Sequence, residues 1–163
     1  AKKIISENLT VQSELIAEFG TDIMGPGNVM DLKKLGRIAL QDEDHQMRLN
    51  LVVHPYIYNL IDEQFNKISA KNKHTMFIVD GALIYESGYD QHLDYVIVIT
   101  ALMKNRMERA MARRTLSRQE ILQRIDLQWS EEDKTGLADF VIHNDSTEEN
   151  LQKEITKIYE RIV

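Results

Sequence analysis

Three short apolar runs that each end in a polar residue constrain the fold more than any other feature of the sequence. They are TMFIVD, DYVIVIT and ADFVIHN, at residues 75–80, 94–100 and 138–144. Continuous runs rich in β-branched residues are typical of strands that are buried on both sides in a parallel sheet. Helical patterns lie between and after these runs. The alternation predicts an α/β fold, a three-layer arrangement in which helices cover both faces of a parallel sheet.

Helical spacing of apolar residues also dominates the N-terminal half. It predicts helices over residues 3–19, 30–40 and 42–70, with Asp31 as the N-cap of the second. Pro55 either kinks the third helix or opens a new one after His54. The breaker cluster GTDIMGPGN, at residues 20–28, predicts a loop. In the other half of the chain, helices are expected over residues 103–113, 117–128 and 147–162.

Composition narrows the class of protein. The 163 residues are enough for one ordinary domain, and the absence of cysteine excludes disulfides and thiolate metal sites. A net charge of -6 argues against a general nucleic-acid binder. No apolar run is long enough to cross a membrane and the N-terminus has no signal-peptide pattern, so a cytoplasmic location is expected. The five histidines lack metal-ligand spacing, and no imidazole metal site is predicted.

The residues that end the three apolar runs are Asp80, Thr100 and Asn144. In parallel sheets, ligands bind at the carboxyl ends of the strands, so these side chains are expected to face a ligand crevice. An acid that follows four apolar residues, as Asp80 does, is typical of the carboxylate near Mg²⁺ in nucleotide hydrolases and kinases. The alternative is that Asp80 caps the turn at Gly81.

A cationic segment follows the second run. Between residues 104 and 124 there are seven basic residues and only two acids, Glu108 and Glu120. Such a patch on an acidic protein suits a small anionic ligand, although a solvated helix face with ion pairs is the alternative. Arg109 and Arg113 share a helix face, and Ser117 with Glu120 predicts the start of another helix. A hinged pair of helices bearing arginines suggests a lid over a nucleotide, or an ordinary surface hairpin.

Several motifs, in order, resemble those of the dephospho-coenzyme A kinase family. They are LVVHPYI, FIVDGALIYESGYD, the stretch from YVIVITALMKN to ADFVIHN, and STEENLQKEITKIYERI, so that the resemblance covers residues 4–162. It implies a phosphate-loop kinase fold and ATP-dependent phosphorylation of the ribose 3'-hydroxyl of dephospho-CoA. It also implies ATP and Mg²⁺ as the cofactors, and small molecules rather than nucleic acid or membrane as the partners. Ala82 stands where the family usually has proline.

The same resemblance implies roles for particular residues and regions. Asp80, Arg109 and Arg113 would be catalytic. ATP would be bound by Arg109, Arg113 and Asn144, and the acceptor by His54, Asp80 and Glu86. One kinase-like domain, residues 1–163, would comprise a helical acceptor lobe at 13–70, a core at 71–112 and 131–163, and a lid at 113–130.

One family feature is absent from the sequence. None of the seven glycines belongs to a G-x-x-x-x-G-K-[ST] phosphate loop. The resemblance implies that roughly 30 residues are missing, about one strand–loop–helix unit, together with the acid proposed as the family's catalytic base. We therefore expect that the parent protein is a complete kinase and that these residues alone do not turn over ATP. A degenerate homologue, a designed fragment, an inactive CoA- or nucleotide-binding module and a different small-molecule kinase are the alternatives.

Overall fold

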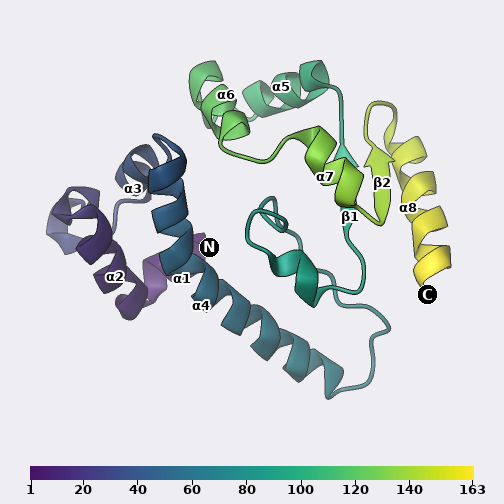
Figure 1. Cartoon of the computed structure of the whole chain (residues 1–163), viewed down its shortest axis with the longest axis horizontal. Coiled ribbons are helices and arrows are strands. Elements are labelled where there is room, and N and C mark those ends of the chain that lie inside the picture. The colour runs from purple at the N-terminus through teal and green to yellow at the C-terminus, as the bar shows by residue number, and fades with distance from the viewer. The chain divides into compact units, whose positions relative to one another are not determined.

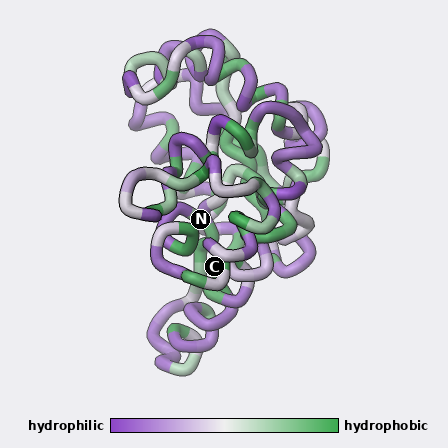
Figure 2. Tube along the Cα trace, turned by 90° about the vertical axis from the view of Figure 1, so that its left-hand side faces the viewer, coloured by the Kyte–Doolittle hydropathy of each residue, from purple (hydrophilic) through white to green (hydrophobic).

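Helices with one apolar side build the first of two units in the computed structural model, which describes residues 1–163 (Figure 1). This unit, Ala1–Gly81, contains α1 (Lys2–Glu7), α2 (Leu9–Phe19), α3 (Leu32–Ala39) and α4 (Glu43–Ser69). Two 3₁₀ turns, Thr21–Ile23 and Pro26–Asn28, occupy the predicted loop. The core is a single cluster of buried residues: Ile5, Val11, Leu15, Ile23, Met30, Leu35, Ala39 and Val53. Figure 2 shows hydrophobic and hydrophilic residues alternating along the trace, as expected for helices with one buried face.

Of the first and third expected helices, only the first differs from the structure. The first is divided at Asn8, whose extended backbone and side-chain oxygen, which accepts from Thr10 N and Val11 N, make it the N-cap of α2. The third runs continuously from Glu43 to Ser69 with Pro55 inside it, within the range expected from the sequence, and this excludes the alternative of a new helix after His54. Proline removes one backbone donor, and here the long helix continues in spite of that loss.

The second unit, Ala82–Val163, carries the sheet. Its elements are η3 (Tyr89–His92), β1 (Ile97–Thr100), α5 (Met103–Ala112), α6 (Arg118–Asp126), α7 (Glu131–Leu137), β2 (Phe140–His143) and α8 (Glu148–Ile162). The two strands are parallel, and Ile97 pairs with Phe140 while Thr100 pairs with His143. Helix α7 contacts β1 and α8 packs against β2, as Figure 1 shows. The parallel sheet and the mixed α/β class confirm the fold prediction.

The strand predicted at residues 75–80 is absent from the structure, so that prediction is wrong. Residues 76–80 form neither helix nor strand, and the Ile78 side chain is 77% exposed. A strand is stable only when its backbone groups pair with a neighbour, and the sheet consists of β1 and β2 alone. Asp80 is therefore not at a strand end. Coverage of both faces of the sheet is also incomplete, because Ile97 and Ile99, on the same side of β1, are 41% and 58% exposed.

None of the helices combines the length and the apolar character that crossing a membrane would require.

Candidate functional site

The carboxyl ends of β1 and β2 meet at a polar edge of the second unit. Asn144, which directly follows β2, donates its backbone N–H to the Thr100 carbonyl at 2.8 Å. Arg109 of α5 donates from Nη1 to the Asn144 carbonyl at 2.9 Å. The predicted neighbours Arg109 and Asn144 are therefore in direct contact. Because that bond uses one guanidinium nitrogen of an exposed side chain, further donors of Arg109 stay available to an anionic ligand.

Asp145 fixes the start of α5 at this edge. The N-cap of α5, Leu102, has no capping side chain of its own. Asp145 Oδ1 instead accepts from Leu102 N at 2.7 Å and from Asn105 Nδ2 at 2.9 Å. A carboxylate at a helix N-terminus pairs with otherwise unsatisfied backbone donors and with the positive end of the helix dipole. Asp145 thus holds α5, and with it Arg109, beside the end of β2.

Glu131 links α7 to the other side of the same edge. Its Oε2 accepts the Thr100 hydroxyl at 2.6 Å, and its Oε1 lies 2.8 Å from Arg106 Nη1. The half-buried Arg106 is thereby engaged in an ion pair, whereas the exposed Arg109 and Arg113 lie further along α5. Of these three arginines of the cationic segment, Arg106 is therefore held by an ion pair within the fold, and Arg109 and Arg113 are exposed.

The helix pair α5 and α6 has the predicted break between its helices. Arg113 is the C-cap of α5, and Arg114 has a left-handed backbone with a φ of 52°. Ser117 opens α6 with the complete capping box, since its hydroxyl accepts from Glu120 N and the Glu120 carboxylate accepts from Ser117 N. The two helices pack on one another. The arginines on both sides of the break were expected from the sequence, and a lid function stays a prediction.

Glu86 lies inside the second unit. Its side chain is 9% exposed and pairs with Lys134 at 2.6 Å. Its Oε1 also accepts the backbone N–H of Trp129 at 3.0 Å. The acceptor-binding role predicted for Glu86 is untested, but one of its carboxylate oxygens already has two donors.

Two other predicted site residues belong to the first unit. His54 is half-buried in α4, and its Nδ1 lies 3.5 Å from the Tyr58 hydroxyl. Burial lowers the pKa of His54 below its ordinary value. Asp80 is exposed, near the end of this unit. The roles predicted for His54 and Asp80, and a position of Asp80 beside the arginines, stay predictions.

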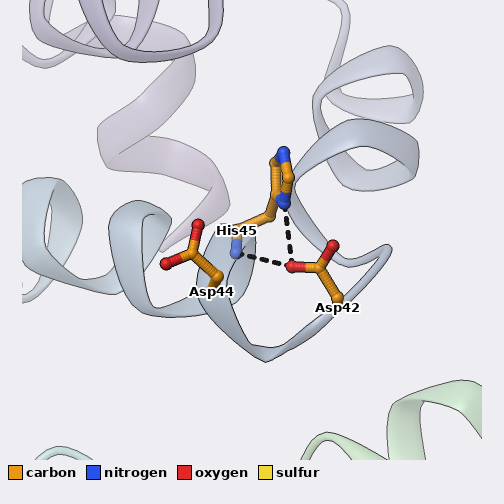
Figure 3. Close-up of side chains that lie close together, drawn as sticks. All are labelled: Asp42, Asp44 and His45. Atoms are coloured by element: carbon orange, nitrogen blue, oxygen red, sulfur yellow. Dashed lines mark hydrogen bonds and ion pairs between the residues drawn. The ribbon is translucent and has the colours of Figure 1, made fainter.

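Asp42, Asp44 and His45 form an acidic cluster at the start of α4, and their potential ligand atoms lie within 4.8 Å of one another (Figure 3). Asp42 Oδ1 accepts from His45 N at 2.9 Å and lies 2.8 Å from His45 Nδ1. The other ring nitrogen of His45 lies 2.7 Å from Gln41 Nε2. Both imidazole nitrogens therefore have partners within the protein. The cluster is explained as an N-cap, and it does not indicate a cation site.

Comparison with known proteins identifies the family to which this sequence belongs. The sequence profile described as dephospho-CoA kinase matches residues 1–150. The chain belongs to the dephospho-CoA kinase family. A dephospho-CoA kinase of Listeria innocua is 31% identical over 164 aligned residues, covering 100% of this chain and 81% of that protein. The enzyme of the same name from Enterococcus faecalis is 32% identical, covering 96% of this chain and 78% of that protein.

Solved structures agree with the family assignment. A dephospho-CoA kinase from Campylobacter jejuni superimposes with a TM-score of 0.62 and 30% identity, covering 98% of this chain and 79% of that one. TT1252 from Thermus thermophilus superimposes with a TM-score of 0.76 and 26% identity, covering 94% of this chain and 78% of that one. The fold is therefore that of the dephospho-CoA kinases, a phosphate-loop kinase type, as the motifs predicted.

The acids and the lysine that hold the site together were not predicted from the sequence. Asp145 was overlooked because its partners, Leu102 and Asn105, are distant in the sequence. Glu131 and Lys134 were overlooked because α7 itself was not predicted. A signal for α7 was present, since Ser130 is followed by three acids, and its hydroxyl accepts from Asp133 N at 3.0 Å.

Proposed function

We propose that the protein transfers the γ-phosphoryl group of ATP to the ribose 3'-hydroxyl of dephospho-CoA, giving coenzyme A. Family membership supports the reaction. The location of the site is supported by one observation, the contact between Arg109 and Asn144 at the carboxyl ends of two parallel strands. Nucleotides bind at this edge in doubly wound folds, and arginine is the side chain best suited to the oxygens of a phosphate.

Arg109 and Arg113 are proposed to bind the phosphates of ATP. They are four residues apart on α5 and so project from the same side of the helix. Arg109 is oriented by the Asn144 carbonyl and needs little reorganisation to meet the ligand. Charge that develops on a transferring phosphoryl group is stabilised most effectively by donors that are already in place. Asn144, which is half-buried beside Arg109, is proposed to contact the adenine.

Asp80 is proposed to be the protein's carboxylate for Mg²⁺. Its side chain is exposed and offers the hard oxygen ligands that Mg²⁺ prefers. Mg²⁺ commonly uses one or two carboxylates, substrate phosphates and water, so a single exposed aspartate fits this ion. When bound, the ion would neutralise charge on the phosphate oxygens. His54 and Asp80 are proposed to contact the acceptor, whereas another role is argued below for Glu86. A cytoplasmic location is also proposed.

The kinase is favoured over an inactive CoA- or nucleotide-binding module. The relatives from Listeria innocua and Enterococcus faecalis are named dephospho-CoA kinase, and this chain spans about four-fifths of their length. The same matches oppose a kinase that acts on free nucleosides.

A phosphorylation assay tests the proposal. The protein as it is encoded, whatever its full length, is incubated with ATP and dephospho-CoA. The product is then separated and its phosphate located by mass spectrometry. We expect coenzyme A phosphorylated at the 3' position. Adenosine and a 3'-deoxy analogue of dephospho-CoA serve as matched acceptors and should gain no phosphate. Phosphorylation of adenosine, or ATP and CoA binding without any transfer, would contradict the proposal.

A further inference from the structure

Glu86 and Lys134 form a largely buried ion pair within the second unit. Their side chains are only 9% and 12% exposed, and Lys134 Nζ lies 2.6 Å from Glu86 Oε1. The Lys157–Glu154 pair has the same separation, but its side chains are 68% and 48% exposed. Desolvation of two charges offsets much of their attraction, so a buried pair is weak support for stability alone. Removing one partner leaves an uncompensated charge.

Hydrogen bonds from Glu86 and Lys134 connect the ion pair to other segments of the second unit. Glu86 Oε1 accepts from Trp129 N at 3.0 Å, and Lys134 Nζ donates to the Ala82 carbonyl at 3.1 Å. The Tyr85 ring stacks on that of Trp129, with centroids 6.3 Å apart and planes inclined by 6°. The turn at residues 82–88, the connection after α6 and helix α7 are thereby joined at one point, where Trp129 itself is 47% exposed.

These contacts of Glu86 and Lys134, called the junction below, lie just after the C-terminal end of the α5–α6 pair. Trp129 is three residues beyond the end of α6, and Glu131, at the start of α7, holds Arg106 and Thr100. The N-terminal end of the same helix pair is held by Asp145, which accepts a hydrogen bond from Leu102 N. The helices that carry Arg109 and Arg113 are therefore attached to the unit at both ends, and Glu86 supplies the attachment after α6.

We propose that Glu86 is a positioning residue. By holding Trp129 N and Lys134 it fixes the end of the α5–α6 pair, and through it the two arginines that meet ATP. The inference rests on the proposed function of those arginines. It differs from the acceptor-binding role suggested by the sequence, in which Glu86 would contact dephospho-CoA directly.

The two roles give different kinetics. The variants are Glu86→Ala, Glu86→Gln and Lys134→Met in the intact protein, and the exposed pair supplies the matched control Lys157→Met. We expect Glu86→Ala and Lys134→Met each to raise the KM for ATP by about tenfold, equivalent to about 1.4 kcal/mol, with the KM for dephospho-CoA unchanged. Glu86→Gln keeps an oxygen for Trp129 N, so its effect should be smaller. Lys157→Met should behave as the unsubstituted protein.

Two results would overturn the proposal. A rise in the KM for dephospho-CoA alone would mean that Glu86 contacts the acceptor. A fall in kcat with both KM values unchanged would mean that the substitutions only reduce the folded fraction, because inactive molecules do not alter a KM. If Glu86→Ala does not fold, Glu86→Gln and Lys134→Met decide between these outcomes.

A second readout does not depend on catalysis. Trp129 is the only tryptophan in the sequence, so its fluorescence reports on the junction. We expect greater quenching by acrylamide in Lys134→Met than in Lys157→Met, and weaker binding of ATP in a fluorescence titration. Unchanged quenching and ATP affinity would overturn the inference even if the protein were active. Changed values in a protein that transfers no phosphate would support the inference and contradict the proposed reaction.

Discussion

Arg109 donates a hydrogen bond from Nη1 to the backbone carbonyl of Asn144, across 2.9 Å and 35 residues of sequence. The bond joins a helix to the end of a strand, and it orients a guanidinium at the carboxyl edge of the sheet. An arginine held in this way can stabilise phosphate charge without first being ordered, which lowers the entropic cost of binding and catalysis.

Asp145 should contribute to stability through the start of α5. Replacing it with alanine removes the acceptor shared by Leu102 N and Asn105 Nδ2. We expect Asp145→Ala to lower the free energy of unfolding by about 1 kcal/mol, in the range of other helix-capping losses. Asp145→Asn keeps a carbonyl oxygen and should lose less. Urea denaturation followed by circular dichroism measures both, and equal losses in the two variants would show that capping is not the cause.

His54 should make stability depend on pH in the acidic range. Burial holds the pKa of folded His54 below the ordinary value of 6.5. Between these two values the unfolded chain binds more protons than the folded one, so stability falls as the pH decreases below 6.5 and levels off below the folded pKa. In His54→Asn this loss should be absent. The loss is measured from the urea midpoints of the unsubstituted protein and His54→Asn as the pH is lowered through 6.5. Parallel dependence of the two midpoints on pH would contradict the prediction.

Asp42 should also lower stability toward acid, but in a lower pH range than His54, because the folded pKa of each group lies below its own ordinary value. The pKa of Asp42 is held below its ordinary value of 3.8, first by the hydrogen bond from His45 N and then by the His45 side chain. A carboxylate with a depressed pKa stabilises the fold above 3.8, and this contribution is lost as the pH falls through the folded pKa. Asp42→Asn retains a capping oxygen but not the charge. The difference in urea midpoint between the two proteins should be constant above that range and decrease below it; a difference that persists unchanged in acid would refute the assignment.

Local signals in the sequence were read correctly where a helix terminus decides the structure. Asp31 accepts from Lys33 N and Lys34 N as the N-cap of α3, and Ser117 with Glu120 forms the capping box of α6. These contacts span three residues or fewer, so the pattern contains the whole interaction. The strands β1 and β2 also lie within their predicted ranges, because their apolar runs are short and strongly β-branched.

Interactions between residues that are distant in the sequence could not be predicted from local patterns. Residues 75–80 have the composition of a buried strand, but a strand depends on a neighbour that the pattern does not specify. Within the site, Arg109 and Asn144 were both predicted, yet the residues that orient the edge, Asp145 and Glu131, act on partners 25 to 43 residues away in the sequence. Their role follows from the fold and not from their spacing.

The central claim is that Arg109 meets the phosphates of ATP during transfer to dephospho-CoA. The most direct test is kcat/KM for ATP, at saturating dephospho-CoA, in Arg109→Lys, with Lys153→Ala on the exposed face of α8 as the control. Lysine keeps the charge, but it cannot bond the Asn144 carbonyl and a phosphate with the same planar geometry. We predict a fall of about 10²-fold in Arg109→Lys and none in the control. A value for Arg109→Lys equal to that of the unsubstituted protein would contradict the account.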